Sequence, residues 1–173
     1  MKKIGMIAAI LLMLTGCGST QTMETVSDQL LQPVSATMQQ MVASLPQDAS
    51  VEVLQDTQNG KIYLCDGFTI TVQTMQSGDL QKTVKTLTGC SPDKLTIIQT
   101  KQDDCKRYEF VWSAAGETQM QVGRACILDD GAYHYAITVM ADESISGEMT
   151  DVWNDIFASM RLISPDIDLN TGS

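Results

Sequence analysis

The sequence contains one histidine, few aromatic residues and no apolar stretch long enough to cross a membrane as a helix. Aromatic residues make up 5% of the 173 residues, and the longest apolar stretch, Ile4–Leu14, has only 11. His134 is the single histidine and no two cysteines have Cys-x-x-Cys spacing, so the usual zinc ligands are not grouped. No Asp-x-Asp-x-Asp-Gly loop suits calcium. We therefore predict no metal and no cofactor.

Basic residues are also few. The chain has 11 lysines and arginines against 21 aspartates and glutamates, which gives a formal net charge of −10 at pH 7. Binding to nucleic acid, or by charge to an anionic lipid surface, requires clusters of basic side chains. The composition therefore argues against a nucleic-acid partner, and any attachment to a membrane must have another cause.

The N-terminal residues are typical of an export signal. Lys2 and Lys3 precede the apolar stretch Ile4–Leu14, which has the length of a signal-peptide core and not that of a permanent anchor. Leu14-Thr15-Gly16-Cys17 then resembles the bacterial lipobox, in which small residues precede an obligatory cysteine. The resemblance implies cleavage between Gly16 and Cys17, and acyl chains such as palmitate on Cys17.

This resemblance predicts a lipoprotein on the extracytoplasmic face of the cell membrane, held there by lipid on Cys17. Residues 1–16 would be the signal peptide, and residues 17–24 the lipidated cysteine with its tether. Two or three acyl chains hold a protein firmly to a bilayer. Loss of Lys2 and Lys3 takes the net charge from −10 to −12. An ordinary signal peptide cut near Gly16, with an incidental cysteine, is the alternative.

Four further cysteines would lie outside the cytoplasm, where disulfides form. They are Cys65, Cys90, Cys105 and Cys126. Two disulfides among them allow three pairings, and we prefer Cys90–Cys105 with Cys65–Cys126, because Cys90 and Cys105 flank one expected strand. Four buried free thiols remain the alternative.

The chain after the tether divides into three parts. Residues 25–46 have apolar residues at helical spacing from Val26 to Leu45, and Pro33 predicts a kink. We expect this helix to pack on the domain's own sheet; the alternative is a helix on the membrane surface, which usually carries basic residues that this one lacks. Residues 47–163 form the main domain, and residues 164–173 an acidic flexible tail.

Alternating apolar residues predict a strand-rich main domain. The expected strands are residues 51–58, 61–65, 68–75, 94–102, 106–114, 117–128 and 132–141. Turn dipeptides such as Asp66-Gly67 join neighbouring strands into hairpins. Asp79 and Gly89 are placed to begin and end a short helix, and Ser146–Ile163 predicts a closing helix with a continuous apolar stripe.

This order of elements is similar to the PsbP-like fold. The segments that carry the resemblance are Leu87-Thr88-Gly89, Tyr108-Glu109-Phe110-Val111-Trp112, the hairpin Ile127-Leu128-Asp129-Asp130-Gly131-Ala132-Tyr133-His134-Tyr135, and Trp153-Asn154-Asp155-Ile156-Phe157-Ala158-Ser159-Met160. The resemblance implies an α+β protein, an α/β/α sandwich around a largely antiparallel sheet of six or seven strands. It carries over no site residue, since these segments build the fold.

Candidate catalytic residues are sparse. Pairing about Asp130 would bring Cys126 opposite His134, which is the sharpest catalytic hypothesis, but a catalytic thiol needs exposure and activation. Asp129-Asp130 and Asp103-Asp104 are typical of turns. Arg124 lies in an apolar strand, where we expect it to pair with an acid such as Glu109.

Three classes of function follow from these observations. We favour a non-catalytic envelope lipoprotein that binds an envelope protein or a small ligand, or assists a membrane complex. The alternatives are an extracytoplasmic thiol enzyme or hydrolase that uses Cys126 and His134, and a structural surface protein. A concave apolar pocket between the sheet and the Trp153 helix would favour ligand binding, a flat apolar surface patch would favour a protein partner, and a smooth polar exterior would favour the structural protein.

Overall fold

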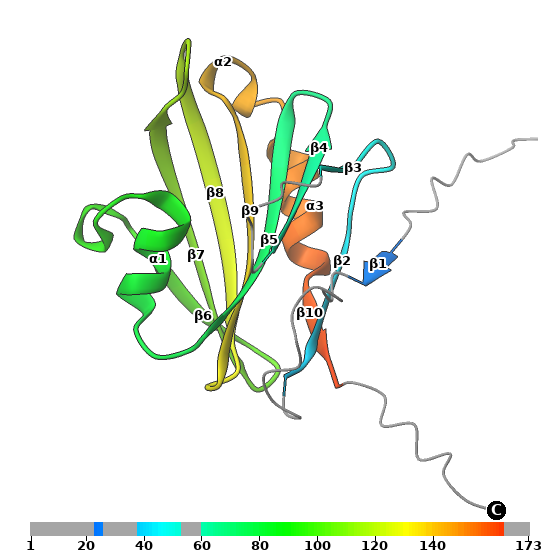
Figure 1. Cartoon of the computed structure of the whole chain (residues 1–173), viewed down its shortest axis with the longest axis vertical. Helices are drawn as coiled ribbons and strands as arrows, with labels where there is room; N and C mark the ends of the chain where they lie inside the picture. The colour runs from blue at the N-terminus through cyan, green and yellow to red at the C-terminus, as the bar shows by residue number, and fades with distance from the viewer. Residues whose placement is uncertain (1–22, 26–37, 53–59, 165–173) are drawn as a thin grey trace, which may run out of the picture.

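An antiparallel sheet of seven strands forms the centre of the structure (Figure 1). The structure, a computed structural model, describes residues 23–25, 38–52 and 60–164. The sheet order is β3-β4-β5-β9-β8-β7-β6. Its strands are β3 (Ser50–Glu52), β4 (Gly60–Cys65), β5 (Phe68–Gln76), β6 (Ile98–Gln102), β7 (Cys105–Ala115), β8 (Met120–Asp129) and β9 (Tyr133–Asp142).

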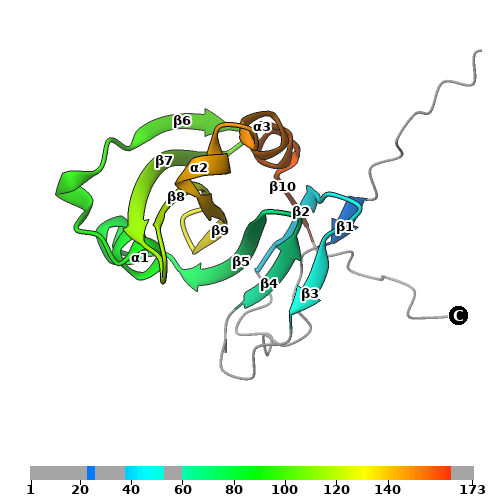
Figure 2. The ribbon, with the colours of Figure 1, turned by 90° about the horizontal axis from the view of Figure 1, so that it is seen from above.

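Helices cover both faces of this sheet, which confirms the expected α/β/α sandwich. On one face lies α1 (Leu80–Thr88), followed by the 3-10 turn η1 (Pro92–Lys94). On the other lie α2 (Glu143–Ser146) and α3 (Thr150–Ser159), with a small sheet of order β1-β2-β10 beside them (Figures 1 and 2). The strands of the small sheet are β1 (Met23–Thr25), β2 (Gln40–Ser44) and β10 (Arg161–Ile163).

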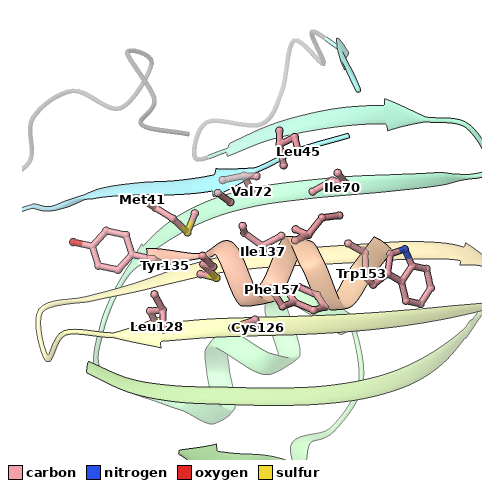
Figure 3. Packing of buried hydrophobic residues seen from close by; sticks show 14 of the residues in the cluster. Met41, Leu45, Ile70, Val72, Cys126, Leu128, Tyr135, Ile137, Trp153 and Phe157 are labelled. Carbon is pink, nitrogen blue, oxygen red and sulfur yellow. The ribbon is translucent and has the colours of Figure 1, made fainter. Parts of the chain in front are cut away.

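The central strand β9 is buried on both faces. Its odd-numbered residues from Tyr133 to Ala141 belong to a core that also holds Trp153, Ile156 and Phe157 of α3 (Figure 3). Ala136, between them, belongs to a second core under α1, with Val84 and Tyr108. Because successive side chains of a strand point to opposite faces, one strand serves both cores.

The short helix α1 begins and ends where its sequence predicts. The Asp79 carboxylate accepts a hydrogen bond of 2.9 Å from the Gln81 backbone N–H, which satisfies a donor that has no partner within the helix. At the other end Gly89 adopts φ 70°, and its N–H donates to the Lys85 carbonyl. Glycine accepts this left-handed conformation without a steric penalty, so the helix stops there.

The predicted helix from Val26 to Leu45 is wrong over the part that the structure describes. Residues 40–44 form β2, which pairs with both β1 and β10, while residues 26–37 lie outside the described part. Met41, Val42 and Ala43 are all buried. A short strand that is buried on both faces produces apolar neighbours that mimic helical spacing, so the pattern was ambiguous. β2 therefore belongs to the core of the main domain.

The closing segment, which was predicted as one helix over residues 146–163, is divided into separate elements. α2 ends at Ser146, α3 occupies residues 150–159, and Arg161–Ile163 form β10 and pair with β2. The Ser159 hydroxyl accepts a hydrogen bond of 2.8 Å from the Ser44 backbone N–H and donates one to the Ile156 carbonyl. The helix therefore ends where β2 offers its own hydrogen-bonding partners.

The expected strands within 61–65, 68–75, 106–114 and 132–141 are confirmed to within two residues. β6 begins at Ile98 instead of residue 94, because Pro92–Lys94 turn as η1, and β8 begins at Met120. Only residues 51 and 52 of the expected strand 51–58 are described, and they lie in β3. Asp66-Gly67 forms its hairpin turn, with Gly67 at φ 81°.

Gly123 offers a test of the packing under α1. It lies opposite Trp112 in the β7–β8 pair, and a Cβ atom there would overlap the buried, rigid indole. Gly123→Ala should therefore lower the free energy of unfolding by about 1–3 kcal/mol, as overpacked cores do. Gly147→Ala is the matched control, because nothing lies within 4 Å of its Cβ position. Urea unfolding measures both, and equal stabilities of the two variants would contradict the packing described.

Candidate functional site

A cleft of about 680 Å³ lies between the β6–β7–β8 end of the sheet and the α2–α3 segment. The helices on this face pack mainly over β5, β9 and β8, which leaves the outer strands partly uncovered (Figure 2). Its apolar lining includes Ile98, Val111, Val122 and Trp153, and its charged lining is Lys94, Glu109 and Arg124. The cleft has the size and mixed lining typical of ligand-binding sites.

The rim of the cleft is unusually apolar. The Ile98 side chain is 60% exposed and that of Val111 is 54% exposed, on neighbouring strands. Ile98 is the cross-strand partner of Glu109, two residues from Val111, so all three side chains share one face of the sheet. Single exposed apolar residues are common on protein surfaces, but these two lie together beside a cleft.

Three charged residues form a network at the floor of the cleft, which Glu109 and Arg124 line and Arg107 supports from outside the lining. The Glu109 carboxylate accepts 2.8 Å from Arg107 Nε and 3.1 Å from Arg124 Nη2. Arg107 also donates to the Phe157 carbonyl at 3.0 Å, and the Arg124 guanidinium lies 5.1 Å from the Phe157 ring centroid. The expected partnership of Arg124 with Glu109 is confirmed. The network ties β7 and β8 to α3.

Electrostatics keep Glu109 ionised within this network. Burial by itself raises the pKa of a carboxyl group, but hydrogen bonds and positive charge from Arg107 and Arg124 outweigh it. The pKa of Glu109 is therefore held below its ordinary value. Lys94 and Arg124 against the single carboxylate of Glu109 give the lining of the cleft a net positive charge.

A second polar cluster surrounds His134, on the α1 face of the sheet. The imidazole is only 2% exposed. Its Nδ1 lies 2.8 Å from Thr83 Oγ1 of α1, and its Nε2 lies 3.3 Å from Ser77 Oγ. Ser77 Oγ also donates to Asp129 at 3.1 Å. Sequence analysis missed Ser77 and Thr83, because their approach to His134 depends on how α1 docks.

The Ser77–His134–Asp129 group has the residue types of a hydrolase triad but not its connections. In such triads the carboxylate bonds one imidazole nitrogen and the serine the other. Here Asp129 Oδ2 lies 3.8 Å from Nε2, the nitrogen that faces Ser77, and Nδ1 faces Thr83. The cluster instead joins the β8–β9 hairpin to α1. Burial, which outweighs the nearby Asp129 and Asp130 carboxylates, lowers the pKa of His134.

The proposed pairing of Cys126 with His134 is wrong. The β8–β9 register pairs Cys126 with Ile137 and Asp129 with His134. The real register differs from the expected one by an odd number of residues, which moves His134 to the opposite face of the sheet. Cys126 is fully buried in the core under α3, and burial raises its pKa to about 12. This thiol lacks the exposure and activation that a catalytic cysteine needs, which argues against a thiol enzyme built on Cys126 and His134.

The structure contains neither of the two preferred disulfides, since all four described cysteines are free. Cys65 and Cys126 lie on β4 and β8, three strand spacings or about 14 Å apart, whereas a disulfide needs Cα atoms within about 7 Å. Cys90 packs on the α1 side of the sheet, and Cys105 belongs to the core on the other side. The sheet therefore separates Cys90 from Cys105, whereas Cys65 and Cys126 lie on one face but too far apart.

Asp129 and Asp130 act as turn residues, as expected. Asp129 accepts from the Gly131 N–H at 2.8 Å, and Asp130 accepts from the Tyr133 N–H at 2.7 Å. Among residues 23–25, 38–52 and 60–164 no three acidic, histidine or cysteine side chains group as metal ligands. None of the helices described there is long and apolar enough to cross a membrane. Cys17 and Gly16 lie outside the described residues.

The arrangement of strands and helices is that of the PsbP-like fold. The chain is similar to the solution structure of cyanobacterial PsbP (CyanoP) from Synechocystis sp., with a TM-score of 0.58 and 10% identity, over 87% of this chain and 99% of that one. At this identity the likeness shows the fold alone. No family model matches the sequence, and no curated protein matches it.

Two further solved structures are similar at lower TM-scores. One is a protein from Bacteroides thetaiotaomicron, with a TM-score of 0.49 and 8% identity over 71% of this chain, which spans only 45% of that protein. The other is LpqN, described as involved in cell envelope biogenesis of Mycobacterium tuberculosis, with a TM-score of 0.49 and 10% identity over 82% of this chain and 90% of that one.

The buried His134 should make the stability of the domain depend on pH. The pKa of His134 in the folded state lies below the ordinary value of 6.5. Below pH 6.5 the imidazole therefore binds a proton more readily in the unfolded chain than in the folded chain. The free energy of unfolding should therefore fall as the pH drops below about 6.5, by up to about 1.4 kcal/mol per pH unit. Urea unfolding between pH 7.5 and 5.5 should show a steeper fall for the natural chain than for His134→Gln. Parallel curves would contradict a buried neutral imidazole.

Proposed function

We propose that this chain is a lipid-anchored, extracytoplasmic protein of the cell envelope, non-catalytic, with a binding or accessory role. The cleft between β6–β7–β8 and α2–α3 is its binding site. The observation that carries the proposal is the juxtaposition of exposed Ile98 and Val111 with the Arg107–Glu109–Arg124 network. Apolar surface beside fixed charges is the combination that binding sites use for affinity and orientation.

The chemistry of the described residues supports binding in preference to catalysis. The imidazole of His134 is buried and shared by Thr83 and Ser77, and Cys126 lies on the other face of the sheet. Within the cleft, the Glu109 carboxylate is held ionised by two guanidinium groups, which makes it a poor proton donor or acceptor. A rigid ion pair suits recognition of a partner.

The lipobox supports the anchor. The whole chain is acidic, so charge would not hold it at an anionic membrane. Lipid on Cys17 would supply that attachment. The described domain would then stand at the surface with its cleft open to neighbouring envelope proteins.

Cys17→Ser tests the anchor. In the natural host, the unchanged protein should sediment with membranes and incorporate a labelled palmitate analogue, because acyl chains hold it there. Cys17→Ser should move most of the protein to the soluble or secreted fraction and lose the label. Cys65→Ser is the matched control and should behave as the unchanged protein, since Cys65 belongs to the folded domain. Membrane retention of labelled Cys17→Ser protein would overturn the anchor.

The cleft is tested by a photo-crosslinker in intact cells. With p-benzoylphenylalanine at position 111, the protein should form a discrete crosslinked product on illumination, because the Val111 side chain faces the cleft and is exposed. The same crosslinker at Leu64 is the control, since that side chain is 40% exposed on β4, away from the cleft. Identical products from both positions, or none from position 111, would count against the cleft as the binding site.

A further inference from the structure

β6 is a free edge of the seven-stranded sheet in the described part of the chain. It pairs with β7 on one side only and is last in the strand order. Residues 98–101 are all exposed (Figure 2 shows β6 as the outermost strand beside α2 and α3). A free edge presents backbone N–H and C=O groups that another extended chain can pair with. The edge therefore offers hydrogen-bonding groups directly beside the cleft.

The register shows which residues of β6 present these groups. Gln102 pairs with Cys105 across the two-residue turn Asp103-Asp104, in which Asp103 has φ 52°. A two-residue turn is closed by a hydrogen-bonded pair, and such pairs alternate along an antiparallel ladder. Gln102, Thr100 and Ile98 therefore bond to β7, while Gln99 and Lys101 turn their backbone N–H and C=O groups outward.

A strand added at this edge would contact apolar side chains on the cleft face of the sheet. Ile98 projects toward the cleft, where Val111 lies on the neighbouring strand. A strand added to β6 would place alternate side chains on that face. A large apolar side chain of the added strand would therefore cover Ile98 and Val111, the most exposed large apolar side chains at the cleft.

The charge on the cleft side of this edge is mainly positive. Lys94 and Arg124 line the cleft against one acid, Glu109, and Lys101 lies on β6, while Asp103 and Asp104 follow in the turn at the end of the strand. Lys101 also lies directly opposite Lys106 in the β6–β7 pair. Like charges in that position destabilise a sheet unless something neutralises them. Asp129 lies opposite Lys106 in the β7–β8 pair, so an acidic partner would meet Lys101 at the edge.

We propose that β6 receives an extended, acidic segment of a partner protein as an added strand, with one large apolar side chain seated against Ile98 and Val111. The proposal deepens the proposed function by giving the cleft a partner class, and it rests on that function. Strand addition obtains its affinity from backbone hydrogen bonds and its selectivity from side-chain pockets. A second copy of this chain does not fit as the acidic partner, because its own β6 edge contains no acidic residue.

Gln99→Pro tests the added strand. It removes the outward N–H of residue 99 and spares the ladder to β7, and proline is tolerated at the solvent side of an edge strand. In protein that carries p-benzoylphenylalanine at position 111, Gln99→Pro should lower the yield of crosslinked product about tenfold. The reason is that one backbone hydrogen bond to the partner is lost and the edge is blocked. Gln99→Ala keeps the N–H and should leave the product unchanged. Circular dichroism should show the same thermal midpoint for both variants.

Identification of the crosslinked peptide completes the test. We expect a net acidic segment of another protein, and a synthetic peptide of that sequence should bind the purified domain more weakly as sodium chloride rises from 0.05 to about 0.5 M. A basic segment, a segment of this same chain or a lipid at position 111 would overturn the proposal. A product that survives Gln99→Pro would overturn strand addition and leave the cleft as the binding site. No product at all from position 111 would contradict the proposed function itself.

Discussion

Burial of β9 on both faces is the constraint on which the rest of the structure depends. A strand that must be covered on both sides requires one core under α1 and another under α3, and both β9 and its neighbour β8 contribute buried residues to each core. The remaining strands lie on either side of β9, and the helices cover less of the strands near the edges of the sheet. The sandwich therefore has a well-packed centre and one exposed flank, formed by β6 and β7.

That uneven cover explains why the candidate site lies where it does. α3 and β2 share the core with β5, β9 and β8, so the outer part of that face remains open as the cleft. The Arg107–Glu109–Arg124 network closes the boundary between the two regions, since it satisfies charged groups where β7 and β8 meet α3. The same ion pairs that fix α3 in place therefore also shape the floor of the cleft.

Local signals in the sequence predicted the elements well where short-range chemistry decides them. Asp79 and Gly89 set the ends of α1, and glycine-containing turns joined neighbouring strands. The partnership of Arg124 with Glu109 was also foreseeable, because a charge inside an apolar strand needs a neighbouring acid. Helical spacing failed at residues 40–44, where backbone pairing with β1 and β10 outweighs the side-chain pattern.

What the sequence determined by itself was the strands of the seven-stranded sheet, the caps of α1 and the PsbP-like order of elements, and its resemblance to a lipobox predicts an anchor at Cys17. Register and layering were decided only by the tertiary structure. A shift of the β8–β9 hairpin by an odd number of residues placed His134 beside Ser77 and Thr83 and left Cys126 in the opposite core. The cleft, likewise, exists only because α3 covers part of one face. Side-chain alternation makes each face depend on register, and register depends on contacts between residues far apart in the chain.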